Sequence, residues 1–405
     1  MSTEEATEPR PAPATDRIIS IDVLRGFALI GMVMVHFMIM FGNDAAVDTW
    51  PYFILNHGLG DWGAACFLML MGMSQVISKR KITDNMLLFK RALLRGVYLF
   101  VVGLLMLALA WGPFQIWQWD ILTLMGFATV VLFFCRFLPS WAIAVLSGAV
   151  LVATPWVRGS IDFLSTWGGK FIQVPVISRY LPGILLDPAK EYEVIWTPGK
   201  ILKGFLFEGY FPVLPWIIFP LLGFIIGRRI AAGKLRGDLP FLAGGGAALA
   251  VVATVIALAG RSRPGHSIIK GFICPLSFYP DSFSMILFQL GMATLAFCLL
   301  YYCYDVLRKK GKKLSPLQRV YQRTSFFSLT FYFLHYQLIG WTLAIVYLVS
   351  GHYLLGDLMG SYPAMLCGLA GVVLLEVLIY FWEKKRGKYS LEWFLGVLTL
   401  RLTPE

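Results

Sequence analysis

Residues 18–41 read IISIDVLRGFALIGMVMVHFMIMF and form the first long apolar stretch of the chain. About 20 predominantly apolar residues in a helix span the hydrocarbon core of a bilayer, so this stretch is long enough to cross a membrane. Three ionisable residues interrupt it: Asp22, Arg25 and His36. The stretch therefore predicts a membrane-spanning helix that carries polar groups at defined depths.

The composition of the whole chain has the same character. Of its 405 residues, 58% are hydrophobic and only 14% are charged. An ordinary soluble domain carries about 25% charged residues, so this composition excludes a soluble enzyme, a disordered chain and a disulfide-rich secreted module. The six cysteines have no C-x-x-C spacing, and they predict neither a metal site nor a disulfide framework. We therefore predict an all-α fold, a polytopic integral membrane helical bundle.

Ten apolar runs are long enough to be membrane spans. They cover residues 18–41, 61–78, 91–112, 120–138, 141–157, 212–230, 239–260, 283–304, 325–349 and 363–383. If the N-terminus lies inside, most of the 35 lysines and arginines fall in inside segments. Basic residues collect in cytoplasmic loops, so the pattern predicts about ten transmembrane helices with both ends of the chain inside.

The remaining segments complete the predicted organisation. Residues 1–16 are polar and predict a disordered cytoplasmic tail. Residues 17–388 form the transmembrane domain, in which residues 158–211 are a long outer loop or cap. Residues 389–405 are amphipathic and are expected to lie in the membrane interface as a helix. The net charge of +12 follows from the positive-inside pattern, so we expect membrane lipids and no nucleic acid as partners.

Ionisable residues inside a membrane are costly and are therefore functional candidates. Asp22 and Arg25 are three residues apart, so they share a helix face and can neutralise each other. Arg25 and His36 are eleven residues apart, which places them on one face and roughly 16 Å apart along the axis. With the N-terminus inside, Arg25 lies near the cytoplasm and His36 near the outside. The structural alternative is a buried ion pair and a histidine that only packs.

Three further candidates lie elsewhere in the chain. His335 occupies the middle of the run SLTFYFLHYQLIG, where a neutral imidazole could act as a base or a proton relay, or simply be a core histidine. His57 precedes Asp61 by four residues in an outside segment, where most histidines have no function. Asp120 begins the fourth run and could orient a histidine, bind a sugar hydroxyl or cap a helix.

Four arginines lie near the predicted inner side: Arg91, Arg95, Arg228 and Arg229. Arginine forks match phosphate geometry, so these residues could bind a polyanionic donor. The positive-inside pattern explains basic residues at this side without any ligand. Glu376 lies inside the tenth run and requires a partner such as an arginine.

The string RIISIDVLRGFALIGMVMVH, residues 17–36, resembles the opening helix of the transmembrane acyltransferase superfamily. It looks most like the bacterial relatives of heparan-alpha-glucosaminide N-acetyltransferase. The matching residues are Arg17, Ser20, Ile21, Asp22, Leu24, Arg25, Gly26, Met32 and His36. Later stretches resemble other helices of that family: CFLMLMGMSQVIS, FPVLPWIIFPLLGFIIGR, FYPDSFSMILFQLGMATL and FFSLTFYFLHYQLI.

The resemblance implies an acyltransferase with acetyl-CoA as co-substrate and no metal. The phosphates of acetyl-CoA would bind Arg25 and the other inner arginines, Arg91, Arg95, Arg228 and Arg229. Asp22, which lies beside Arg25, would belong to the same donor site. The catalytic candidates are His36, His57, His335 and Asp120, with His36 and His57 competing for the role of general base. The acceptor would be a hydroxyl or amine of a glycan or glycolipid on the outer side. The expected location is the bacterial plasma (inner) membrane, crossed several times.

Other functions remain open at this point. Buried Asp22, Arg25, His335 and Glu376 would also suit the proton relay of a proton-coupled transporter or flippase for a glycolipid or small anion. A non-catalytic scaffold is a third class. An acetyl-histidine intermediate is compatible with the same residues. The sequence determines neither the acceptor and the acyl length nor whether the chain forms a homo-oligomer.

Overall fold

The computed structural model describes residues 18–78, 84–159, 197–261, 271–279, 281–308, 313–351 and 354–400. Over these residues the regular secondary structure is helical, and the strand-like pairing consists of one bridge between Gly42 and Met359. Seven helices are long and apolar enough to cross a membrane. The predicted all-α class and the polytopic membrane bundle are confirmed. The number of spans and the side on which each terminus lies remain predictions.

Each of the ten apolar runs coincides with a helix. These helices are α1 (Ile19–Phe41), α3 (Asp61–Ile77), α4 (Asn85–Trp111), α5 (Ile121–Cys135), α6 (Ser140–Gly159), α11 (Ile218–Ala231), α12 (Leu235–Arg261), α14 (Phe283–Tyr301), α16 (Ser328–Ser350) and α17 (Ser361–Lys384). The largest difference at a boundary is the early start of α4. Asp84 caps this helix by accepting hydrogen bonds from the backbone N–H groups of Met86 and Leu87, and a cap of this kind stabilises a helix start by about 1 kcal/mol.

Two segments differ from the simple pattern of spans and loops. The run at 212–230 is not one regular helix, because α10 (Val213–Trp216) precedes α11 within it. A short helix, α9 (Pro198–Lys203), and a π-helical turn (Gly204–Glu208) lie just before this run. Prolines that lack an N–H group interrupt a helix, and Pro212 and Pro215 lie at this break. The outside segment 42–60 is largely helical rather than a loop. It contains α2 (Trp50–Leu55) and a π-helical turn (Asn56–Gly60) that leads directly into α3.

Some expectations concern residues outside the described ranges. They are the disordered tail at 1–16 and most of the cap at 158–211. The amphipathic C-terminal segment is partly described. It forms α18 (Leu391–Leu400), which contacts α4 and α16.

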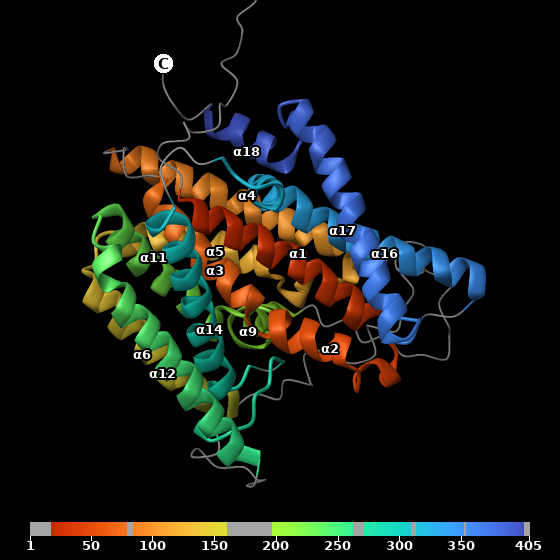
Figure 1. The fold of residues 1–405 in the computed structure, drawn as a ribbon, viewed down its shortest axis with the longest axis horizontal. Helices are drawn as coiled ribbons and strands as arrows, with labels where there is room; N and C mark the ends of the chain where they lie inside the picture. Colours follow the sequence, from red (N-terminus) through yellow and green to blue (C-terminus); the bar gives the residue numbers. More distant parts are fainter. Residues whose placement is uncertain are drawn as a thin grey trace, which may run out of the picture.

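Helix α1 lies at the centre of the fold (Figure 1). It contacts α3, α14, α15 (Pro316–Phe326), α16 and α17. A side chain at Gly26 would place its Cβ 2.1 Å from the main-chain oxygen of Tyr321, so glycine allows α15 to approach closely. Gly26 meets Tyr321, Arg25 meets Ser325, and His36 meets His335. These contacts place the α15–α16 segment alongside α1.

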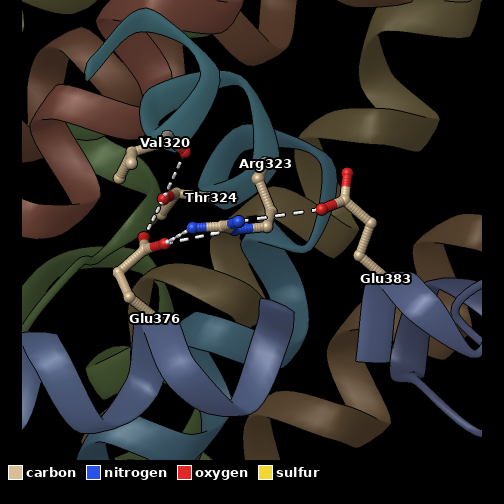
Figure 2. Close-up of polar contacts among 5 residues, drawn as sticks. All are labelled: Val320, Arg323, Thr324, Glu376 and Glu383. Atoms are coloured by element: carbon tan, nitrogen blue, oxygen red, sulfur yellow. Dashed lines mark hydrogen bonds and ion pairs between the residues drawn. The ribbon is translucent and has the colours of Figure 1, made fainter. Parts of the chain in front are cut away.

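The partner expected for Glu376 is Arg323 of α15. Its Nη2 lies 2.9 Å from Oε2 of Glu376, and the hydroxyl of Thr324 donates to Oε1 (Figure 2). Glu383, about two turns further along α17 and more exposed, lies 3.7 Å from Nη1 of the same arginine. An ionised group in a membrane helix requires such partners, so this network attaches α15 to α17.

We predict that Gly72→Ala destabilises the protein by about 1–3 kcal/mol through overpacking. A Cβ at Gly72 would lie 2.1 Å from the main-chain oxygen of Pro220, where α3 and α11 pack backbone to backbone. Gly63→Ala on the same helix is the matched control, because its Cβ would meet no atom within 4 Å. Thermal unfolding in detergent measures both. Equal unfolding temperatures for the two variants would contradict the packing.

Candidate active site

One cavity of about 890 Å³ reaches from the middle of α1 to the segments beyond its C-terminal end. Its floor includes Ala28 and Leu29, and its upper wall includes Met40. Helices α2, α3, α12, α14 and α16 and the start of α5 complete the wall. The polar lining residues are His36, Tyr52, Asn56, His57, Asp61, Gln118, Asp120, Tyr210, Thr254, Tyr279, Tyr332 and Tyr336. A large, mainly apolar cavity with a few convergent polar groups is the usual form of a small-molecule site.

His36 and His335 form a hydrogen bond across the α1–α16 interface. Nδ1 of His36 lies 2.9 Å from Nε2 of His335. Nδ1 of His335 is hydrogen-bonded to the main-chain oxygen of Tyr332. His335 is completely buried, whereas His36 is partly exposed and lines the cavity. The ring of Tyr336 packs against both imidazoles, with centroids 5.2 Å from His36 and 4.3 Å from His335.

These contacts assign the protons of the two rings. A carbonyl oxygen only accepts, so Nδ1 of His335 carries a proton and donates it to Tyr332. An imidazolium buried in a membrane helix without an anionic partner is costly, so His335 is neutral and its Nε2 is an acceptor. His36 must then donate from Nδ1, which leaves its own Nε2 without a proton. His36 also lines the cavity, so its imidazole is accessible from there.

Asp120 both caps a helix and joins the site. It precedes α5 and accepts a hydrogen bond of 3.1 Å from the N–H group of Leu122. The hydroxyl of Tyr332 donates to its two oxygens at 2.8 and 3.1 Å. Because the main-chain oxygen of Tyr332 holds His335, Asp120 is connected to the histidine pair through one residue. The N-cap that the sequence offered as an alternative is present, and the side-chain partner of Asp120 on α16 is Tyr332.

His57 and Asp61 form a second acid–base pair in the same cavity. Nδ1 of His57 lies 2.8 Å from Oδ2 of Asp61, and the histidine side chain is 54% exposed. The π-helical turn that contains His57 is a local irregularity of a kind frequent at functional sites. Since the carboxylate accepts from Nδ1, Nε2 of His57 is also the nitrogen available as a base.

The charged residues of α1 near its inner end share one contact. Ser325 of α15 donates to Oδ1 of Asp22 at 3.1 Å and accepts from Nη1 of Arg25 at 3.5 Å. Nη2 of Arg25 also donates to the hydroxyl of Ser74 on α3, at 2.5 Å. Ala28 and Leu29, which line the cavity, are three and four residues further along α1. Arg25 therefore lies about one helical turn, or roughly 5 Å, below the cavity floor.

Arg91 and Arg95 belong to the same inner region. Arg95 of α4 lies within electrostatic range of Arg25. The Nε atoms of Arg91 and Arg95 are buried and have no hydrogen-bond partner among the described residues. Buried donors without partners are rare, so each such atom requires an explanation such as an absent ligand or water. Arg95 therefore lies near Arg25, and Arg91 precedes Arg95 by one turn of α4.

Arg228 and Arg229 have different surroundings. Arg228 donates to the main-chain oxygens of Cys135, Arg136 and Leu138, at 2.7 to 3.0 Å. Arg229 pairs with Asp238 of α12 at 2.5 and 2.9 Å. Both guanidinium groups therefore have protein partners that the sequence did not reveal. Arg228 holds the turn between α5 and α6, and Arg229 joins α11 to α12.

Several contacts of the site carry no signal in a single sequence. Ser74 and Ser325 are ordinary helix residues, and the pairing of His36 with His335 depends on how α1 and α16 pack. The tyrosines at 210 and 279 follow long outer segments whose fold the sequence did not specify. In the part of the chain that the structure describes, His, Cys, Asp and Glu residues form no group of three that could hold a metal ion.

We predict that both histidines of the pair are neutral and carry their proton on Nδ1 at neutral pH. The tautomers follow from the carbonyl of Tyr332, which fixes first His335 and then His36. Nitrogen-15 NMR of histidine-labelled protein measures them, with His36→Gln and His335→Gln to assign the signals. A proton on Nε2 of His36, or an imidazolium at either position, would contradict the assignment.

The family model described as heparan-alpha-glucosaminide N-acetyltransferase, catalytic, matches residues 17–263. This segment contains His36, His57, Asp120 and the six candidate residues of the inner side, but it ends before His335. Among curated proteins, none matches the chain. Because the family match covers more than half of its length, the chain belongs to the catalytic-domain family of heparan-alpha-glucosaminide N-acetyltransferase, a family of membrane acetyltransferases.

Proposed function

We propose that this protein transfers an acetyl group from acetyl-CoA at the cytoplasmic side to a hydroxyl or amine of a sugar at the outer side. The observation that carries the proposal is the arrangement along α1. A histidine with a free Nε2 lines the cavity, and an arginine cluster lies one turn below its floor. Membership of an acetyltransferase family supports the same reaction. The membrane would be the bacterial plasma (inner) membrane, with both termini inside.

The donor would bind through its phosphates at the inner arginines. Arg25, Arg91 and Arg95 supply planar forks of donors that match phosphate oxygens, and two of them have buried nitrogens without partners. Arg228 and Arg229 are less suited to this role, because main-chain oxygens and Asp238 already occupy them. The short path from Arg25 to Ala28 and Leu29 would let the thioester reach the cavity while the nucleotide stays inside.

His36 would act as the base in a direct transfer. The acceptor nitrogen or oxygen attacks the thioester carbonyl carbon, the carbon–sulfur bond breaks, and CoA leaves. Nε2 of His36 takes the proton of the attacking group and passes it to the departing thiolate. While His36 is protonated, its Nδ1–H still donates to His335, which disperses the charge toward Tyr332 and Asp120.

His57 is the competing base. Asp61 orients its ring as a carboxylate orients histidine in many hydrolases, and its exposed position is open to a large acceptor. His36 lies deeper and nearer the donor path, so we assign it the proton transfer and place His57 at the entrance for the acceptor. The comparison of alanine variants below separates these two assignments.

The acceptor that we propose first is an amino sugar, because the family description names a glucosaminide. Trp111, Tyr210, Tyr279 and Tyr336 line the cavity and offer aromatic faces for the apolar side of a sugar ring. The acceptor would be part of a glycan or a glycolipid. The transporter alternative is less well supported, because Glu376 is ion-paired with Arg323 and has no obvious freedom to carry protons.

We expect His36→Ala to lower acetyl transfer at least 100-fold, which is the lower end of what a general base contributes. The assay uses purified protein in nanodiscs, radiolabelled acetyl-CoA and glucosamine-terminated oligosaccharide. His57→Ala should raise KM for the acceptor with a smaller loss of kcat. Arg319→Gln, an exposed residue of α15, is the control for expression and folding. Full activity of a folded His36→Ala variant would refute the role of His36.

We expect Arg95→Gln to weaken the binding of acetyl-CoA, and to do so only through the loss of a contact with the phosphates of the donor. Its KM for acetyl-CoA should rise about tenfold or more, since a hydrogen bond to a charged group is worth about 1.5–3 kcal/mol. Acetyl-pantetheine, which lacks the nucleotide and its phosphates, should be used equally by the variant and the wild type. An equal loss with both donors would show that Arg95 acts on the fold instead.

A further inference from the structure

Helix α16 begins at Ser328, directly after an interruption of the helical path. The preceding residue, Phe327, has φ −96° and ψ 32°, which breaks the path of α15. The N–H group of Phe331 reaches the oxygen of Phe327, but no side chain at the N-cap position accepts from the first turn. The first amide groups of a helix have no partner within that helix, so those of α16 must be satisfied from elsewhere.

Glu392, at the start of α18, satisfies them. Its Oε1 accepts from the N–H groups of Leu329 at 2.6 Å and Thr330 at 2.9 Å. Its Oε2 accepts from the hydroxyl of Thr330 at 2.5 Å. The N–H group of Leu391 donates to the same hydroxyl at 3.0 Å, and the oxygen of Leu391 accepts from Tyr98 of α4. The C-terminal helix thus binds the α16 terminus with four hydrogen bonds and is itself held by α4.

The carboxylate is suited to this position. The N-terminus of a helix carries a partial positive charge, which favours an anion. The pKa of the Glu392 carboxyl is raised above its usual value by burial, and the hydrogen bonds from Thr330 and Leu329 offset only part of that rise. The hydrogen bonds from the N-terminus of α16 therefore favour the anionic form of Glu392. The carboxylate in turn satisfies the N–H groups of that terminus.

The segment before the break is held independently. Arg323 and Thr324 bind Glu376 of α17 (Figure 2). Ser325 binds Asp22 of α1. These contacts fix α15 but end two residues before Phe327. The helix is interrupted at Phe327, so the contacts of α15 do not determine the direction and axial position of α16. A second attachment is required, and Glu392 provides it.

The distance from this attachment to the histidine pair is short. His335 follows Leu329 by six residues, or about 9 Å along the axis, and Tyr332 lies between them. The bond between His36 and His335 tolerates only a few tenths of an ångström, since N–H hydrogen bonds weaken beyond about 3.2 Å. A small slide or rotation of α16 at its N-terminus would therefore separate the two imidazoles.

We propose that Glu392 is a positioning residue for acetyl transfer, which holds α16 so that His335 keeps His36 in the tautomer of a base. This inference rests on the proposed function of His36. Glu392 touches neither the cavity nor a reacting atom, and it lies outside residues 17–263 that match the family. The C-terminal helix is accordingly part of the catalytic unit rather than only a membrane anchor.

The test compares Glu392→Ala and Glu392→Gln with Glu383→Ala in the nanodisc assay. Glu383 is a carboxylate near the same end of the bundle, 56% exposed, and is the matched control. We expect Glu392→Ala to lower kcat at least tenfold with KM for acetyl-CoA unchanged. Glu392→Gln should recover part of the loss, because its amide oxygen still accepts from both N–H groups. Glu383→Ala should behave as the wild type.

A second readout does not depend on activity. Hydrogen–deuterium exchange at the C2 carbon of each histidine, followed by mass spectrometry, reports the environment of individual imidazoles. In Glu392→Ala, exchange should accelerate several-fold at His36 and His335 and stay unchanged at His57. If the alanine variant does not fold, the glutamine variant carries the test, with a smaller shift in the same direction.

A double-mutant comparison completes the test. On a His335→Ala background, replacing Glu392 should cause no additional loss of kcat, because the partner to be positioned is gone. A multiplied loss, or unchanged exchange at His335 in the folded Glu392 variants, would overturn the proposal and leave Glu392 as a structural cap. If the wild type transfers no acetyl group, the proposed function fails, and the exchange result alone still decides whether Glu392 positions the pair.

Discussion

The hydrogen bond between His36 and His335 joins residues 299 apart in the sequence and depends on most of the surrounding structure. It exists because α1 and the α15–α16 segment run side by side, which Gly26 permits by admitting the backbone of Tyr321. Ser325 attaches α15 to Asp22 and Arg25, and Glu376 attaches it to α17 (Figure 2). Each of these polar contacts would be costly in a membrane if one partner were missing, so together they define one arrangement of the helices.

Buried charged residues need partners, and the residues of this protein differ in whether they have them. Arg228, Arg229, Arg323 and Glu376 are engaged with protein partners and connect helices. Arg91 and Arg95 keep buried nitrogens without partners, and His36 lines the cavity. Arg91 and Arg95 lie on α4, with Arg95 near Arg25, and His36 lies eleven residues, or roughly 16 Å, further along α1 than Arg25. That separation matches a donor and an acceptor that are supplied from opposite sides.

The sequence predicted the fold class and the position of every main helix, because lipid permits only helices across its core and the apolar runs reveal them. It also identified the ionisable residues of α1. The 20 residues at 17–36 were enough to indicate the family. It did not predict the broken path before α11, the helical segment at 42–60, the pairing of the histidines or the cap by Glu392. Those features depend on which helices contact one another, and the pattern of apolar residues in a single sequence does not specify these contacts.

The central claim is that acetyl transfer crosses the membrane along α1. It is tested most directly with protein reconstituted into liposomes in one orientation, with acetyl-CoA on one side and a glucosamine-terminated acceptor on the other. The account predicts acetylated acceptor when the donor is on the side of the Arg25 cluster and the acceptor is on the side of His57, and none in the reverse arrangement. Transfer only when donor and acceptor share one side would contradict it.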